Sequence, residues 1–421
     1  TALQILRDWA GGVSFDPAGL ETERGVIESE RRQRDELWSR LWRQNLERMW
    51  AGTAYAQRWP LGDPEVIRTA SVEKLRGFYD AWYRPERLVV MIVGDIDGRE
   101  IESAVHRTFG DLTARSAARP EPGLGAVGGR GVVAMGLSDP DLPAGSMASV
   151  VRLVLREIEP DTPERRRENL RQEIARTMLR RRLAAVSARH GYNFSNPQVE
   201  ENGPFPARVF SLQASGPTWR WNENLAILEQ QLRAALTFGF TEREVRAAAA
   251  AKLSAAEQSA TQWPALGSAG LMSQLADSVH RQTVFSDPVA LLPATREFFE
   301  EVTPEQCLAA FRSVWGGEDR LISVIAPGFG AGKEAAIREA DEKSRRQPVS
   351  APLETRAATF AYTDFGPPGK IERQDFDPGL KFHRVMFANG VRLNVKQRDT
   401  GKQHVDMSIQ FGGGGAAQSA R

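Results

Sequence analysis

The sequence predicts an α+β fold arranged as several consecutive units, and three observations lead to this expectation. Long stretches rich in Glu, Arg, Leu and Ala lack glycine and proline, which is typical of helices. Short apolar runs bounded by turn residues, such as 88–93 and 321–326, are typical of buried strands. A chain of 421 residues is also longer than one hydrophobic core usually organises. We therefore expect two to three domains, each combining helices with strands.

The first unit is expected to span residues 1–115 and to contain one long helix over 20–50. That stretch is nearly free of glycine and proline and carries apolar residues at helical spacing. Trp38, Trp42 and Trp50 recur in it at spacings of four and eight residues, so these three side chains are expected to pack in the core.

The rest of this unit is expected to alternate helix, strand and helix. Ser71 is a suitable N-cap for a helix over 72–83, which Pro85 ends. The apolar run 88–93 is predicted to be a buried strand, and the run 97–109 a further helix.

A linker rich in Ala, Arg, Pro and Gly is expected over 116–130, and a second domain over 131–332. Periodicity predicts four long helices and three strands in this domain. The helices are expected over 163–189, 221–238, 241–262 and 304–315, and the strands near 132–135, 207–214 and 321–326.

A second linker is expected over 333–378, because this stretch is polar and contains proline. A third domain is expected to begin at 379. Residues 379–421 are thus expected to be only the start of that domain. They contain the turn Asn389-Gly390 between two apolar runs, a pattern that predicts a β-hairpin.

The composition excludes several kinds of partner and site. Lysine and arginine number 55 against 54 acidic residues, so the net charge of +1 gives no sign of a nucleic acid or a membrane surface as partner. The lone cysteine, Cys307, excludes an internal disulfide framework and a multi-cysteine metal site. Apolar runs of about eighteen residues are absent, so no transmembrane helix is expected.

Both ends of the sequence have the pattern of interior segments. Residues Thr1 to Asp8 look like the middle of an amphipathic helix, and the sequence stops soon after a new strand pattern begins. We therefore expect an internal piece of a longer polypeptide, with any signal peptide outside it.

The first helical stretch carries two glutamates that could serve a metal site. Glu23 and Glu30 are seven residues apart, which at about 100° per residue places them on one helix face. One carboxylate could bind a cation while the other orients a ligand or a water molecule. On spacing alone, however, a solvated face with ion pairs to neighbouring arginines is the more common explanation.

The residues around these glutamates favour the metal site. The segment Glu23-Arg24-Gly25-Val26-Ile27-Glu28-Ser29-Glu30 resembles the insulinase- and pitrilysin-type zinc peptidases, the inverzincins. In that family a similar run leads to the glutamate that completes the zinc shell. The resemblance implies that Glu30 is the third zinc ligand and that Glu23 is the upstream glutamate that supports catalysis.

Further motifs follow in the order found in that family. They are Pro60-Leu61-Gly62, Trp82-Tyr83-Arg84-Pro85, Val93-Gly94-Asp95, the helix start at 238–245 and the hairpin segment at 387–392. The resemblance thus extends over nearly the whole chain. It implies tandem insulinase-type domains, each a mainly antiparallel sheet packed with helices.

The chain departs from the family pattern at the main metal motif. The five histidines at positions 106, 190, 280, 383 and 404 include no His-x-x-Glu-His pair, which in the family supplies two ligands and the general base. A zinc site needs three or four protein donors, so one carboxylate cannot hold the ion tightly. The remaining ligands of the implied Zn²⁺ are therefore expected outside this chain.

Two functions are compatible with these features. The first is a zinc-dependent endopeptidase that hydrolyses peptides or small proteins by a metal-activated water, represented here by a piece that is inactive alone. The alternative is a non-catalytic scaffold or peptide-binding partner subunit of the same fold. Retention of both Glu23 and Glu30 favours the first, since a decayed site need keep neither.

The resemblance also implies partners and a location. The expected partners are a peptide substrate and either the missing portions of the same polypeptide or a homologous subunit. Bacterial members of the family suggest the periplasm or cell envelope. Nucleic acid is not expected, because the arginine runs 165–167 and 180–182 are interleaved with Glu and Leu as on an amphipathic helix. The glycine-rich run 328–333 lacks the Ser or Thr of a phosphate loop.

Overall fold

The structure, a computed structural model, describes residues 2–127, 131–155, 159–191, 194–202, 207–351, 364, 366–397 and 407–410. It separates into two compact units, residues 1–352 and 353–421. Each unit mixes helices or loops with mainly antiparallel strands, so the predicted α+β class is confirmed. The division into 1–115, 131–332 and 379–421 as separate domains stays a prediction.

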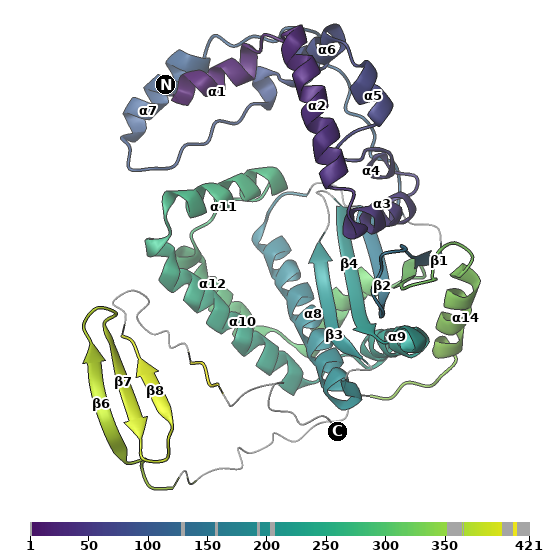
Figure 1. Ribbon diagram of the computed structural model, residues 1–421, viewed down its shortest axis with the longest axis vertical. Helices are drawn as coiled ribbons and strands as arrows, with labels where there is room; N and C mark the ends of the chain where they lie inside the picture. Colours follow the sequence, from purple (N-terminus) through teal and green to yellow (C-terminus); the bar gives the residue numbers. More distant parts are fainter. Residues whose placement is uncertain are drawn as a thin grey trace. The chain divides into compact units, whose positions relative to one another are not determined.

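Short helices joined by loops make up residues 2–127 (Figure 1). They are α1 (Ala2–Gly11), α2 (Pro17–Gln33), α3 (Leu37–Met49), α4 (Ala54–Gln57), α5 (Pro64–Thr69), α6 (Val72–Trp82), the 3-10 turn η1 (Pro85–Arg87) and α7 (Gly98–Phe109). The side chain of Ser71 accepts a hydrogen bond from the Lys74 amide at 3.2 Å, and Asp97 caps α7 in the same way. The helices expected over 72–83 and 97–109 are therefore confirmed.

The single long helix expected over 20–50 is wrong, because the chain breaks between α2 and α3. Glu36 is extended, with φ −93° and ψ 161°, and starts α3 as its N-cap residue. α3 buries Leu41 and Met49, whereas α2 buries none of its residues. The two helices thus follow different directions, and the Arg40 guanidinium donates to the freed carbonyl of Asp35 at 2.9 Å.

The tryptophans of α3 also differ from expectation. Trp50 is buried, with 5% of its surface exposed, but Trp38 is 63% exposed and Trp42 is about half exposed. Helical spacing identifies a common face, yet only contact with another element decides whether that face is buried.

The strand predicted at 88–93 does not form. These residues follow η1 in an extended course without strand pairing, and Val89 is 56% exposed. An apolar run becomes a strand only when a neighbouring strand satisfies its backbone groups. No strand is present among residues 2–127 to pair with it.

A five-stranded sheet organises the rest of the first unit. Its strands are β1 (Val132–Leu137), β2 (Ser146–Leu155), β3 (Ser195–Asn202), β4 (Ala207–Gly216) and β5 (Arg320–Ile325). They lie in the order β1-β5-β2-β4-β3, with β1 and β5 parallel and every other neighbouring pair antiparallel. The three strands expected from sequence are confirmed, while β2 and β3 are additional.

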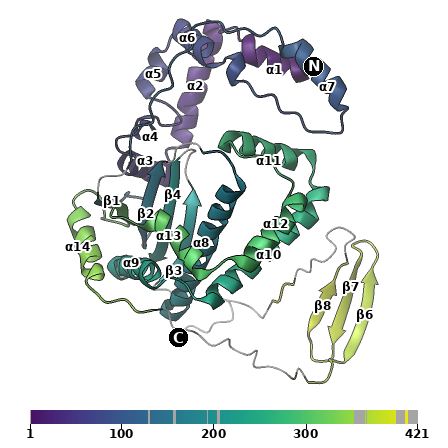
Figure 2. The ribbon, with the colours of Figure 1, turned by 180° about the vertical axis from the view of Figure 1, so that it is seen from behind.

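Seven helices accompany the sheet within residues 159–351, as Figures 1 and 2 show from opposite sides. They are α8 (Pro163–His190), α9 (Trp221–Phe238), α10 (Glu242–Gln262), α11 (Ser268–Arg281), α12 (Pro288–Glu301), α13 (Pro304–Trp315) and α14 (Glu334–Arg345). The four helices predicted in this region are confirmed. α14, in contrast, forms where a linker was expected from residue 333.

The sheet buries a hydrophobic cluster on each face. The larger cluster joins alternate residues of β2 and β4 to α8, α9, α10 and α13, and contains Val150, Ile174, Leu212 and Leu225. The smaller cluster lies on the opposite face and joins the sheet to α3 through Leu41, Met49 and Trp50. The alternation of side chains along each strand explains why one strand serves both clusters.

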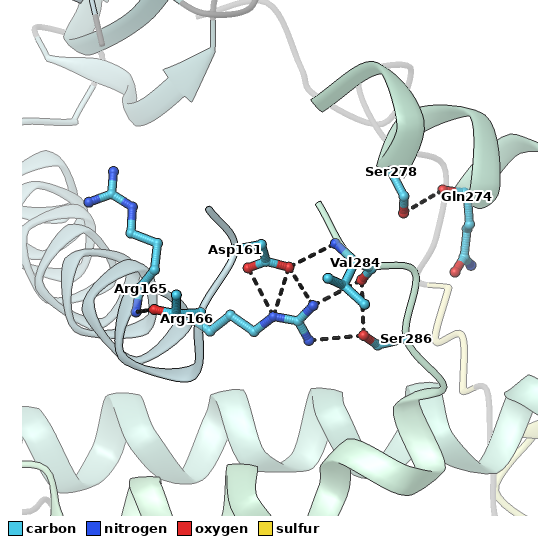
Figure 3. A network of polar contacts seen from close by, with 8 residues as sticks. Asp161, Arg165, Arg166, Gln274, Ser278, Val284 and Ser286 are labelled. Carbon is cyan, nitrogen blue, oxygen red and sulfur yellow. Dashed lines mark hydrogen bonds and ion pairs between the residues drawn. The ribbon is translucent and has the colours of Figure 1, made fainter. Parts of the chain in front are cut away.

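The start of α8 is fixed by a polar network that links it to the turn between α11 and α12 (Figure 3). Arg166 donates to the carboxylate of Asp161, to Ser286 Oγ at 3.0 Å and to the carbonyl of Val284 at 2.9 Å. Asp161 also accepts from the Val284 amide at 2.9 Å. Arg166 therefore has a structural role at the start of α8.

The second unit contains an antiparallel sheet of three strands in the order β6-β7-β8. These strands are β6 (Ile371–Asp377), β7 (Phe382–Phe387) and β8 (Arg392–Val395). The hairpin predicted around Asn389-Gly390 is confirmed, and Gly390 has the positive φ of 85° that this turn requires. β6 lies where a linker was expected.

His404 lies outside the described residues. Among those that are described, no helix has the length and apolar character needed to cross a membrane.

Candidate functional site

Both candidate carboxylates lie on α2. Asp16 begins this helix by accepting a hydrogen bond from the Gly19 amide at 2.8 Å, and Pro17 occupies the first helical turn, where its missing N–H has no cost. Glu23 and Glu30 are two helical turns apart, which is about 10.5 Å along the helix axis. The helix thus presents them on one face as a rigid pair.

Glu30 sits in the last turn of α2 among basic residues. Its carboxylate forms an ion pair with Arg34 at 2.6 Å, and 39% of its side chain is exposed. Glu28 pairs with Arg31 at 2.7 Å, and this hydrogen bond lowers the pKa of the Glu28 carboxyl. Arg31, Arg32 and Arg34 complement the negative end of the helix dipole. This surface therefore has the ion-paired character that spacing alone suggested.

Glu23 borders an apolar cavity of about 640 Å³ between α2, α5 and the start of α6. Its other lining residues are mainly aliphatic, with one aromatic ring, and include Phe15, Leu20, Ile27, Val66, Ile67, Val72 and Leu75. Arg24, beside Glu23, donates to the carbonyls of Arg68 and Ala70 and so joins α2 to the end of α5. Apolar side chains therefore surround Glu23 on this side of α2.

The described residues do not by themselves form a zinc site. Within them, no group of three or more His, Cys, Asp or Glu side chains is arranged to hold a metal ion. Glu30 would supply one oxygen donor, and its present partner is Arg34. Since zinc needs three or four protein donors, the described part of the chain does not by itself fit the ion.

Residues that fix the corner between α2 and α3 have no signal in the sequence. Arg40 binds Asp139 through two parallel hydrogen bonds of 2.8 Å, although 99 positions separate them. Asp139 has only 4% of its side chain exposed. Hydrogen bonds from Arg40 and from the Asp141 amide lower the pKa of Asp139 to about 2. Only the tertiary structure brings this pair together, so local spacing could not reveal it.

Comparisons with known proteins find similarity to proteases over part of the chain. Residues 69–152 match the family described as "Peptidase M16 inactive domain". A probable zinc protease, PqqL, of Haemophilus influenzae is 35% identical over 100 residues, 24% of this chain and 11% of that protein. The probable zinc protease PqqL of Escherichia coli is 30% identical over 119 residues, 28% of this chain and 12% of that protein.

The fold is shared with solved structures over a greater length. The crystal structure of the periplasmic protease PqqL from Escherichia coli matches 96% of this chain with a TM-score of 0.74 and 18% identity. This chain covers 44% of that structure, and the aligned segments cover about a tenth of the two curated relatives. The chain is thus similar in sequence to probable zinc proteases over about a quarter of its length, and it shares its fold with a periplasmic protease.

Proposed function

We propose that this chain is part of a zinc-dependent endopeptidase and does not hydrolyse peptides alone. The observation that carries the proposal is the placement of Glu23 and Glu30 on one face of α2, while the described residues contain no group of three or more donors that could hold a metal ion. In this proposal Glu30 binds the zinc ion as one of its ligands. Glu23 lies two turns earlier on the same helix and supports the reaction from there.

For Glu30 to act in this way, the other donors must come from elsewhere. The family resemblance identifies them as the histidines of a His-x-x-Glu-His motif, located on another part of the polypeptide or on a homologous subunit. The carboxylate would exchange the guanidinium of Arg34 for the metal ion. Their ion pair is partly exposed, and such pairs are worth only about 0–1 kcal/mol, so the exchange is inexpensive.

A non-catalytic role for the region around the sheet is favoured by the family match. The matched family is described as an inactive domain, and residues 69–152 extend from α5 through β1 into β2. We propose that this region helps to hold the peptide substrate, while Glu23 and Glu30 belong to the metal-binding half. The periplasm or cell envelope is the proposed location, supported by the periplasmic PqqL structure of similar fold.

The test uses a full-length polypeptide in which the histidine motif precedes this chain. Glu30→Gln should lose both bound zinc and peptide hydrolysis, whereas Glu23→Gln should keep zinc and lose turnover. Glu28→Gln is the matched control, because Glu28 lies on the same helix and pairs with Arg31. It should keep both properties.

Zinc content is measured by mass spectrometry of the purified variants. Turnover is measured as the rate at which they hydrolyse an unstructured peptide. Full zinc binding and full activity in Glu30→Gln would remove Glu30 from the site. Equal loss in Glu28→Gln would indicate that the whole helix, and no particular carboxylate, is responsible.

A further inference from the structure

A second cavity, of about 560 Å³, opens between α3, the loop that follows it and the sheet. From α3 through Pro60 it is lined by Trp42, Asn45, Leu46, Met49, Trp50, Tyr55, Arg58 and Pro60, and from the sheet by Val151, Asn202, Val209, Ser211 and Gln213. We infer that this cavity binds a peptide through a large apolar side chain next to an acidic group.

The walls of the cavity are aromatic and held in place. The rings of Trp50 and Tyr55 are 5.1 Å apart, and those of Trp42 and Trp59 are 4.7 Å apart. The Arg43 guanidinium lies over the ring of Trp59 at 4.8 Å from its centroid. Such ring pairs have defined geometry, so an apolar side chain enters a preformed space.

The floor of the cavity is polar and regular. Val209, Ser211 and Gln213 alternate along β4 and therefore face the same side of the sheet. The strand register brings Val151 of β2 opposite Ser211, and Asn202 of β3 opposite Val209. Ser211 accepts a hydrogen bond from Gln213 Nε2 at 3.3 Å. Hydroxyl and amide groups on this floor can bind the amides of a ligand.

The strand under the cavity has the backbone repeat of an extended peptide. Ser211 and Gln213 are two residues apart on β4, so about 7 Å separates their positions along the backbone. An extended peptide repeats its amide groups and its same-side side chains over that distance. The volume is also in the range of about 300–1,000 Å³ that is usual for ligand pockets.

The charge of the cavity indicates which residue stands next to the apolar residue in the bound peptide. Arg58 is the one charged residue among the lining residues, and no carboxylate lines the cavity within the described part of the chain. Arg58 is exposed, and none of the ion pairs found among the described residues includes it. A carboxylate beside the bound side chain would therefore meet an available guanidinium, which favours an acidic peptide.

This inference deepens the proposed function, because it gives a docking position to the peptide substrate of that proposal. The two ideas fail separately. Peptide binding is measured on this chain without zinc and without turnover, so its outcome does not depend on Glu30.

The experiment uses the chain labelled with 5-fluorotryptophan and followed by ¹⁹F NMR. The Trp42 signal is assigned with Trp42→Phe. Three capped dipeptides serve as probes: acetyl-Glu-Phe-amide, acetyl-Lys-Phe-amide and acetyl-Glu-Ala-amide. We expect acetyl-Glu-Phe-amide to shift the Trp42 signal in a saturable manner, acetyl-Lys-Phe-amide to bind more weakly, and acetyl-Glu-Ala-amide to bind weakest.

Variants then locate the site. Ser211→Phe, which fills the floor, should abolish the shift. Asn45→Trp fills the cavity from the α3 side and should also abolish the shift. This variant leaves the sheet unchanged, so it tests the site even if Ser211→Phe does not fold. Arg58→Gln should weaken acetyl-Glu-Phe-amide by about two- to fivefold, as expected for an exposed ion pair. Arg243→Gln, on the exposed side of α10, is the charge-matched control and should bind like the wild type.

Several results would overturn the inference. They are the absence of any shift at Trp42, equal binding of the Glu-Phe and Lys-Phe probes, and unchanged binding in a folded Asn45→Trp protein. A Trp42 shift that depends on protein concentration without any peptide would assign the cavity to a second copy of this chain instead.

Discussion

Leu41 anchors α3 on the sheet, and its replacement by alanine tests how the second cavity and the corner next to α2 are held. The side chain is 3% exposed and packs in the cluster that also contains Met135, Leu137 and Val151. Polar contacts of α3 support this packing, because Arg48 donates to the carbonyl of Gly136 at 2.8 Å. Leu41→Ala leaves the polar contacts in place and removes only the apolar anchor.

The expected loss follows from the burial of Leu41. A fully buried leucine contributes about 1.5–3 kcal/mol by transfer from water, and the remaining cavity adds to the cost of its removal. We therefore expect Leu41→Ala to destabilise the docked helix by about 2–4 kcal/mol. At 1.4 kcal/mol for each factor of ten, this corresponds to about a 30-fold to several-hundred-fold increase in local opening.

Hydrogen-exchange mass spectrometry measures this opening directly, in peptides that cover residues 37–49. Trp38→Ala is the matched control, since it removes a larger side chain from the same helix at a site that is 63% exposed. It should change stability by no more than about 0.5 kcal/mol. Equal acceleration of exchange in the two variants would refute the conclusion that α3 buries the face of Leu41 and exposes the face of Trp38.

Two other consequences of burial can be measured on the same chain. In the folded protein, hydrogen bonds from Arg40 lower the pKa of Asp139 from 3.8 to about 2, so the stabilisation is complete above pH 3.8 and is lost as the pH falls through about 2. Asp139→Asn should therefore lower the urea midpoint at neutral pH, with a difference from wild type that narrows between about pH 4 and pH 2; a constant difference over that range would contradict the assignment. Burial raises the pKa of the Cys307 thiol to about 12, so the native chain should react slowly with a disulfide reagent such as DTNB and quickly after unfolding in urea. Rapid reaction of the native thiol would show that its surroundings are open.

Elements with strong local signals could be predicted from the sequence. The helix over 304–315 begins with a capping box formed by Thr303 and Gln306 and ends at Gly316, and its limits agree with the expected ones. The hairpin around Asn389-Gly390 could also be predicted, because a two-residue turn determines its conformation locally.

Features that depend on distant partners could not be predicted. The apolar run 88–93 has the composition of a strand, but strand formation requires pairing that no element within residues 2–127 provides. Next to the break between α2 and α3, Arg40 binds Asp139, which lies 99 positions away. In both cases the local sequence is compatible with the expected element, and tertiary contacts decide the outcome.

The candidate site shows the same distinction. The shared helix face of Glu23 and Glu30 follows from their spacing of seven residues, and the Arg34 partner of Glu30 follows from a spacing of four. The peptide-binding cavity is different, since its lining residues come from positions 42–60 and 151–213. Nothing in either segment alone indicates that they form one surface.

The proposed function assigns one carboxylate of a zinc site, that of Glu30, to this chain and the other ligands to residues outside it. The most direct measurement is the zinc retained by the purified, metal-free chain after incubation with excess zinc and gel filtration, compared between wild type and Glu30→Gln. Both proteins should retain the same substoichiometric amount. One equivalent of zinc in the wild type, lost in Glu30→Gln, would contradict this assignment.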